Sequence, residues 1–182
     1  MDFNDVVNSR ISVRSYLDTE VDETKLMEII ENGCKAPTAG NLQPWEFIIV
    51  RNALKKQEIV DTTFVGNDFQ GKNTQKWMLD APVLIVVCGN YAKISERYGE
   101  FGKKTLLYLD ISACIENMLL TIVNSGLSSC YVSGFRTEDL SKVLKLPENI
   151  IPIGILPVGY AKGATVKRKK EETISKVHYD IY

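Results

Sequence analysis

The pattern of hydrophobic and polar positions divides the chain into segments with helical spacing and segments typical of strands. Amphipathic spacing begins after Asp22, a residue type favoured at helix N-caps, and ends at Gly33. From Thr105 to Ser125 the apolar residues would occupy almost every face of a helix. Such a helix must be buried on most faces, inside the domain or against a second copy. The predicted helices span residues 2–8, 22–33, 54–62, 105–125 and 138–144.

Runs of β-branched and apolar residues predict about four strands. The run Pro82–Cys88 is apolar on both faces, which indicates a central strand that is covered on each side. Residues 66–75 are polar and predict a mobile connection. Helices interleaved with strands of a single sheet make the fold class α+β. The predicted strands span Trp45–Val50, Pro82–Cys88, Ser129–Phe135 and Ile151–Gly159.

The length of 182 residues and the apolar content of 45% predict a single domain, residues 1–182, with one core. Residues 162–182 are charged and poorly periodic, so we expect them to form a C-terminal arm. Four consecutive basic residues in this arm, Lys167 to Lys170, are typical of a solvated face or of nonspecific polyanion binding.

The net charge of −1 gives no global attraction to nucleic acid or to an anionic membrane, so any anion site must be local. The first residues lack the basic and then apolar order of a signal peptide, and no apolar stretch reaches the roughly 20 residues of a membrane span. We therefore expect a cytoplasmic protein with no membrane and no nucleic-acid partner.

Cysteine and histidine usage excludes several kinds of site. The four cysteines form no CxxC pair and have apolar neighbours, which indicates reduced, buried thiols. His178 is the only histidine, so a histidine-rich zinc site and the common Ser-His and Cys-His mechanisms are nearly excluded. We expect no metal.

Two arginines and a serine near the N-terminus are candidates for anion binding. In an extended segment Arg10, Ser12 and Arg14 share one face, and forked guanidinium donors with a hydroxyl suit a phosphate monoester. A solvated basic edge is the alternative interpretation of these residues.

A second candidate is the loop between Pro37 and Pro44. Its amides, Asn41 and Gln43, offer both donors and acceptors, and the prolines restrict the backbone. Such amides can recognise the edge of a heterocycle such as a flavin pyrimidine. An ordinary turn from helix to strand is the alternative.

These segments resemble the nitroreductase family of FMN-dependent NAD(P)H oxidoreductases. The resemblance covers nearly the whole chain and occurs in the family's order and spacing. It rests on five segments: Arg10–Tyr16, Ala36–Phe47, Leu79–Pro82, Gly126–Tyr131 and Leu156–Tyr160.

The resemblance implies a three-layer fold, with a central mixed or antiparallel sheet flanked by helices, in a homodimer with FMN in two clefts at the interface. It implies that Arg10 and Ser12 hold the FMN phosphate and that Arg168 completes this clamp. Arg14 would reach the N1 and O2 edge of the ring, where a fixed cation favours the reduced flavin.

The resemblance also assigns residues to the flavin ring. Gln43 would lie near the ribityl chain or the ring, and the backbone N–H of Gly134, beside Ser133, would point at N5. Lys76 is a further candidate at the ring edge, although a surface lysine is the commoner case. The partner chain would border the ring with Pro37, Thr38, Ala39 and Asn41.

The implied activity is that of a ping-pong oxidoreductase. NADH or NADPH would pass a hydride to the flavin N5, and a nitroaromatic, quinone or similar small acceptor would then take the electrons. Catalysis would need no acid or base from the protein. Two alternatives are a dehalogenase or flavin-fragmenting relative, and an FMN-binding protein without turnover, such as a flavin store or redox sensor. Tyr98 and Phe101 could cover the ring or pack under the long helix.

Overall fold

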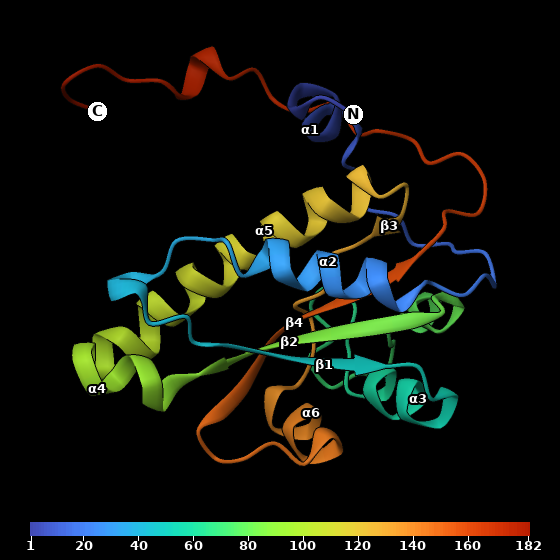
Figure 1. The fold of residues 1–182 in the computed structure, drawn as a ribbon, viewed down its shortest axis with the longest axis horizontal. Coiled ribbons are helices and arrows are strands. Elements are labelled where there is room, and N and C mark those ends of the chain that lie inside the picture. The colour runs from blue at the N-terminus through green and yellow to red at the C-terminus, as the bar shows by residue number, and fades with distance from the viewer.

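The computed structural model describes residues 1–182 as three layers, with a sheet between two sets of helices (Figure 1). Helices α2 (Glu23–Gly33) and α5 (Leu107–Asn124) cover one face of the sheet, and α3 (Ala53–Asp61) and α6 (Thr137–Leu144) cover the other. The predicted α+β class is confirmed. The remaining elements are α1 (Phe3–Ser9), α4 (Tyr91–Phe101), the short helices η1 (Ala39–Asn41), η2 (Lys76–Asp80), η3 (Gly102–Leu106) and η4 (Ile174–Lys176), and the strands described next.

The sheet has four antiparallel strands in the order β1 (Trp45–Val50), β2 (Val83–Asn90), β4 (Ile150–Gly159) and β3 (Ser128–Ser129). The predicted central position of β2 is confirmed, since it is paired on both sides and buried along its length. Alternate side chains of this strand enter the two cores, one on each face, as the pleat requires.

The helix caps follow from single polar residues. Asp22 accepts a hydrogen bond from the backbone N–H of Thr24 at 2.8 Å, which confirms the predicted start of α2. This helix packs against α5, and the two approach closely at Gly33. A Cβ built on Gly33 would lie 2.6 Å from Cγ of Met118, so only glycine fits this contact without a shift.

The helical region before α5 is longer than the sequence predicted. Helix α4 begins directly after β2, where Asn90 caps it, and the π-helical turn η3 joins it to α5. Gly99 interrupts the helical backbone of α4 with a φ of 55°. By length and composition, Tyr91–Asn124 as a whole is long and apolar enough to cross a membrane. In this fold α5 fills the core between α2 and the sheet, which accounts for its apolar composition.

The predicted strand Ser129–Phe135 is wrong for most of its length. Only Ser128–Ser129 forms a strand, and the chain then crosses from the sheet toward the end of α3. Val132 pairs with Ile155 of β4, whereas Phe135 pairs with Thr63 beyond α3. The apolar residues alternate because they enter a core, but successive residues pair with different neighbours, so no continuous ladder forms.

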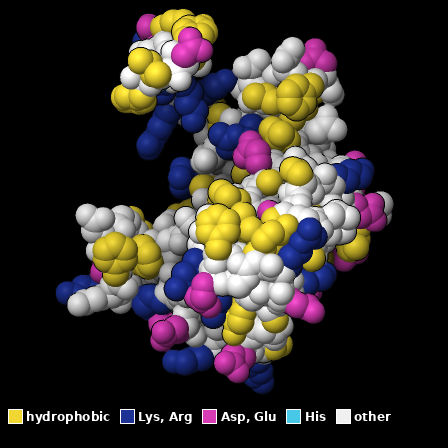
Figure 2. All heavy atoms as spheres, turned by 90° about the vertical axis from the view of Figure 1, so that its left-hand side faces the viewer, with side chains coloured by type: hydrophobic (Ala, Val, Ile, Leu, Met, Phe, Trp, Pro, Cys, Tyr) yellow, Lys and Arg dark blue, Asp and Glu magenta, His cyan; other side chains and the backbone are white.

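The C-terminal arm and the four cysteines differ in their exposure to solvent. Residues 162–182 are exposed throughout, and the end of this arm forms a separate lobe near the top of Figure 2, with hydrophobic side chains on its surface. All four cysteines are free. Cys88, Cys114 and Cys130 are buried, as predicted, but Cys34 is only half-buried.

Candidate functional site

A basic cavity of about 400 Å³ lies between the N-terminal segment and the start of the C-terminal arm. It brings together Arg10, Ser12, Arg14 and Arg168, four of the residues predicted to contact the cofactor. No carboxylate lines it, and none of its arginines or lysines forms an ion pair. The other residues that line the cavity are Ile11, Thr165, Val166, Lys167 and Lys170.

Backbone pairing holds the N-terminal segment that follows α1, residues 10–14, in an extended conformation. Ser12 forms a parallel bridge with Ser129, and the N–H of Val13 donates to the carbonyl of Ser129 at 3.0 Å. Val13 is buried in the core, whereas Ser12 is half-buried and Arg14 is exposed. Because side chains alternate along an extended chain, the burial of Val13 leaves Ser12 and Arg14 facing the cavity.

The polar groups around the cavity suit an anion. Burial raises the pKa of the Cys130 thiol, and the nearby Arg14, Ser12 and Arg10 counteract this effect. Ser129, which bridges to Ser12 but does not line the cavity, has a buried hydroxyl oxygen with no hydrogen-bond partner. Cations without acidic partners, a serine hydroxyl and a cavity of this size fit a phosphate monoester, because charge-assisted hydrogen bonds would replace lost hydration.

The predicted ring-binding loop lies elsewhere in the chain, between α2 and β1. Pro37, Thr38, Ala39, Asn41 and Gln43 lie close together here, and none of them lines the basic cavity. The loop is locked by local bonds, since the N–H of Gln43 donates to the Thr38 hydroxyl at 3.1 Å. Asn41 and Gln43 have φ of 57° and 50°, a left-handed conformation that is uncommon for residues other than glycine.

Asp110 of α5 anchors this loop, a role that sequence reasoning missed. The N–H of Ala39 donates to the two carboxylate oxygens of Asp110 at 3.1 and 3.2 Å. Burial raises the pKa of this carboxyl, and the hydrogen bond from Ala39 opposes the rise. An acidic residue inside an apolar helical run was the available signal, because a buried carboxylate needs a partner.

Gly134, the predicted N5 contact, lies in the segment that crosses from the sheet to α3. Its carbonyl accepts a hydrogen bond from the N–H of Phe64 at 2.9 Å, but its own N–H has no partner within the chain. A Cβ at this position would lie 3.1 Å from the carbonyl oxygen of Phe64, so the close approach favours glycine. Ser133 beside it is exposed. The half-buried Gly134 amide is therefore a free donor.

The remaining candidates differ in exposure. Lys76, at the start of η2, is exposed. Tyr98 is half-buried and packs against the core, with the guanidinium of Arg97 5.3 Å from its ring centroid. Phe101 is 62% exposed at the end of α4. Of the two aromatic residues predicted as a cover, Phe101 is the more exposed, whereas Tyr98 packs against the core.

Trp77 is a second residue that sequence reasoning missed. Its ring centroid lies 5.8 Å from the guanidinium carbon of Arg14, a cation–π arrangement, and the ring also stacks on Tyr16 with centroids 6.5 Å apart. A tryptophan next to a predicted contact, Lys76, was a weak signal because such residues are more often core.

Comparison with known proteins places these features in a family context. The family model described as "Nitroreductase family" matches residues 7–160 of this chain. A protein of Methanothermobacter thermautotrophicus, provisionally named NADH dehydrogenase/NAD(P)H nitroreductase, is 29% identical over 164 residues, covering 88% of this chain and 78% of the relative. Iodotyrosine deiodinase of Hydra vulgaris is 29% identical over 201 residues, covering 97% and 71%.

A solved structure shows the same fold. The crystal structure from Parabacteroides distasonis, also provisionally named NADH dehydrogenase/NAD(P)H nitroreductase, superposes with a TM-score of 0.83 at 27% identity. The match covers 98% of each chain. The arrangement of sheet and helices is thus similar over the full length.

Proposed function

The chain belongs to the nitroreductase family, and we propose that it is an FMN-dependent NAD(P)H oxidoreductase whose basic cavity holds the FMN phosphate. The observation behind this proposal is the convergence of Arg10, Ser12, Arg14 and Arg168 on one cavity without a carboxylate. Arginine donors bind phosphate oxygens bidentately, so a cofactor with a terminal phosphate is the natural occupant.

Two groups of the chain, Arg14 of the cavity lining and the Gly134 amide, would meet the flavin ring. Arg14, seated on Trp77, would place its cation near N1 and O2, where it stabilises the negative charge of the reduced form. The unpaired N–H of Gly134 would donate to N5. Both groups orient the cofactor and tune its reduction potential, and neither needs to transfer a proton.

We propose that the site is completed by a second copy of the chain. The residues Pro37, Thr38, Ala39, Asn41 and Gln43 do not line the basic cavity of their own chain, so a dimer would supply them from the partner. Helix α5 exposes Tyr108 and Leu109, and α1, which packs on α5, exposes Phe3 and Val7. Such apolar groups on one layer suit a homodimer interface.

When bound, FMN would supply the redox chemistry, which is hydride transfer from NADH or NADPH followed, in ping-pong order, by electron transfer to a nitroaromatic, quinone or similar small acceptor. The chain's task is to place the donor above the ring and to exclude competing reactions. Besides a second copy of the chain, we propose that the partners of the enzyme are small molecules and that it acts in the cytoplasm. Residues 1–182 would act as one domain with residues 162–182 as its arm.

The test is an anaerobic absorption spectrum of the purified protein with FMN, before and after addition of NADH or NADPH. We expect a yellow holoprotein that bleaches with either donor and recovers its colour with a quinone or nitroaromatic. A protein that stays colourless with added FMN refutes the proposal. Bound FMN that neither nicotinamide reduces would instead favour a flavin store or redox sensor.

A second candidate function is reductive dehalogenation, which the likeness to the Hydra vulgaris deiodinase favours. Product analysis separates the two, because release of iodide from iodotyrosine by the reduced holoprotein would assign it to dehalogenation. Turnover of quinones or nitroaromatics without iodide release would assign it to the first candidate.

A further inference from the structure

The segment around Gly134 is fixed from both sides. Upstream, Val132 and Ile155 exchange two backbone hydrogen bonds of 3.0 and 2.8 Å. Downstream, the N–H of Arg136 donates to the carbonyl of Thr62 at 2.9 Å. Between these anchors the Gly134 amide has little freedom to move, so it can serve as a fixed reference point in the site.

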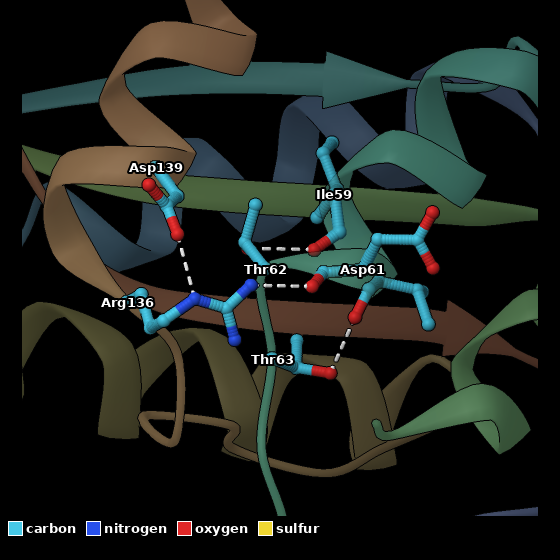
Figure 3. A network of polar contacts seen from close by, with 7 residues as sticks. Ile59, Asp61, Thr62, Thr63, Arg136 and Asp139 are labelled. Atoms are coloured by element: carbon cyan, nitrogen blue, oxygen red, sulfur yellow. Dashed lines mark hydrogen bonds and ion pairs between the residues drawn. The ribbon is translucent and has the colours of Figure 1, made fainter. Parts of the chain in front are cut away.

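The side chain of Arg136 strengthens the downstream anchor. Nε donates to the Asp139 carboxylate at 2.6 Å and Nη2 donates to the carbonyl of Asp61 at 2.7 Å, so one guanidinium links α6 to the end of α3 (Figure 3). The hydroxyls of Thr62 and Thr63 close the same turn by donating to backbone carbonyls of α3. The backbone that faces Gly134 is therefore held by local hydrogen bonds and by the Arg136 guanidinium.

Gln75 donates two hydrogen bonds to this backbone segment, one to Thr63 and one to Phe64. Its backbone N–H donates to the Thr63 hydroxyl oxygen at 2.8 Å, and its side-chain Nε2 donates to the carbonyl of Phe64 at 2.9 Å. Phe64 is the residue whose N–H binds Gly134. Gln75 thus has a defined position relative to the Gly134 amide.

The other polar atom of the Gln75 side chain binds the tryptophan next to Arg14. Oε1 accepts a hydrogen bond from the indole N–H of Trp77 at 2.8 Å. Trp77 stacks on Tyr16 and its ring centroid lies 5.8 Å from the Arg14 guanidinium carbon, so a change in the tilt of the ring would move the surface against which the guanidinium rests. One glutamine side chain therefore connects the Gly134 segment to the residue that supports Arg14.

We infer that Gln75 is a positioning residue, which sets Trp77, and through it the Arg14 guanidinium, at a defined place relative to the Gly134 amide. This inference rests on the proposed function, in which both groups meet the flavin ring. If Gln75 loses its side-chain bonds, the Gly134 segment keeps its own anchors while Arg14 loses its defined place. The reduced form of FMN, which needs the cation most, should then lose more affinity than the oxidised form.

The test measures FMN affinity and reduction potential in the holoprotein of the wild type and of Gln75→Met, a near-isosteric change that removes both side-chain bonds. We expect the affinity for reduced FMN to fall about tenfold relative to that for oxidised FMN, a shift of about 30 mV toward negative potential for two electrons. Gln57→Met is the matched control, because Gln57 is exposed and binds only Asp61 within α3. It should leave the potential unchanged.

A double-mutant cycle shows whether Gln75 acts through Arg14. In an Arg14→Ala background, Gln75→Met should add no further shift, because the group it positions is absent. If Gln75→Met does not fold, Trp77→Phe gives the same test, since it removes the indole N–H and retains a ring beneath Arg14. That variant should shift the potential in the same direction.

Three outcomes would overturn the inference. One is an unchanged potential in a Gln75→Met protein that binds FMN, and another is an equal shift in the Arg14→Ala background. The third is a wild type that binds no FMN, which refutes the proposed function and the inference together. The first two leave the proposed function standing, so the two failures are distinguishable.

Discussion

The backbone nitrogen of Ala39 lies 3.1 and 3.2 Å from the two carboxylate oxygens of Asp110, across the boundary between the loop predicted to border the flavin ring and α5. Asp110 is only 7% exposed, so this hydrogen bond replaces water around a carboxylate. The loop that the proposed dimer inserts beside the flavin is thereby fixed to the longest core helix.

This pair predicts a specific pH dependence of stability. Burial raises the folded pKa of Asp110 above its ordinary value of 3.8, so the carboxyl favours the folded state most at low pH, and this contribution is lost as pH rises through the folded pKa. The free energy of unfolding of the wild type, minus that of Asp110→Asn, should therefore fall as pH rises above 3.8. Urea unfolding of both proteins between about pH 4 and pH 7 measures it, and a constant difference would contradict it.

The basic cavity predicts which variants lose the cofactor. Arg10→Ala should raise the dissociation constant of FMN by at least about tenfold, because hydrogen bonds to charged groups contribute about 1.5 to 3 kcal/mol. Riboflavin, which lacks the phosphate, should bind the variant and the wild type equally. Fluorescence titration with both ligands measures this. Lys169→Ala is the control, because Lys169 lies beside Arg168 but does not line the cavity.

The exposed apolar residues of α5 predict the assembly. Leu109 is 61% exposed on this helix, and Leu109→Glu should place a charge in the proposed dimer interface and yield monomers that bind FMN poorly. Leu54→Glu should leave the dimer intact, since Leu54 is 77% exposed on α3, in the opposite layer. Sedimentation velocity decides the matter; a wild type that sediments as a monomer would exclude the proposed dimer.

The close contact at Gly33 predicts a destabilising alanine. In a helix, alanine is favoured over glycine by about 1 kcal/mol, but the added methyl group would meet Met118 Cγ at 2.6 Å in a filled core. We expect Gly33→Ala to lower the free energy of unfolding by about 1 to 3 kcal/mol. A rise in thermal stability would show that Met118 moves aside easily.

Much of the fold follows from local patterns along the chain. The run at Pro82–Cys88 predicted the central strand because its apolar residues are continuous, and Asp22 predicted the start of α2 because a side-chain cap is a local bond. Such signals depend on a few neighbouring residues. They are therefore visible in one sequence.

The errors arose where pairing partners are distant. Val132 pairs with β4 and Phe135 pairs with Thr63, so an apparently uniform strand divides between two neighbours that no local pattern identifies. Helix α4 was missed because Gly99 interrupts a segment with only one buried residue.

In the candidate site, too, some features follow from local sequence patterns and others depend on distant contacts. The shared face of Arg10, Ser12 and Arg14 follows from spacing, whereas the approach of Arg168 depends on the path of an arm more than 150 residues later. The roles of Asp110 and Gln75 exist only through tertiary hydrogen bonds to Ala39 and Phe64. No spacing rule would have found them.

The depth of the cysteines provides a probe of unfolding that needs no engineered label. Burial raises the pKa of Cys88 and of Cys114 to about 12, so at about pH 8 almost none of these two thiols is ionised in the folded protein. Alkylating reagents should therefore modify Cys88 and Cys114 only after β2 or α5 opens, whereas the half-buried Cys34 is more accessible. The order in which mass spectrometry finds these thiols modified would report how cooperatively the core comes apart.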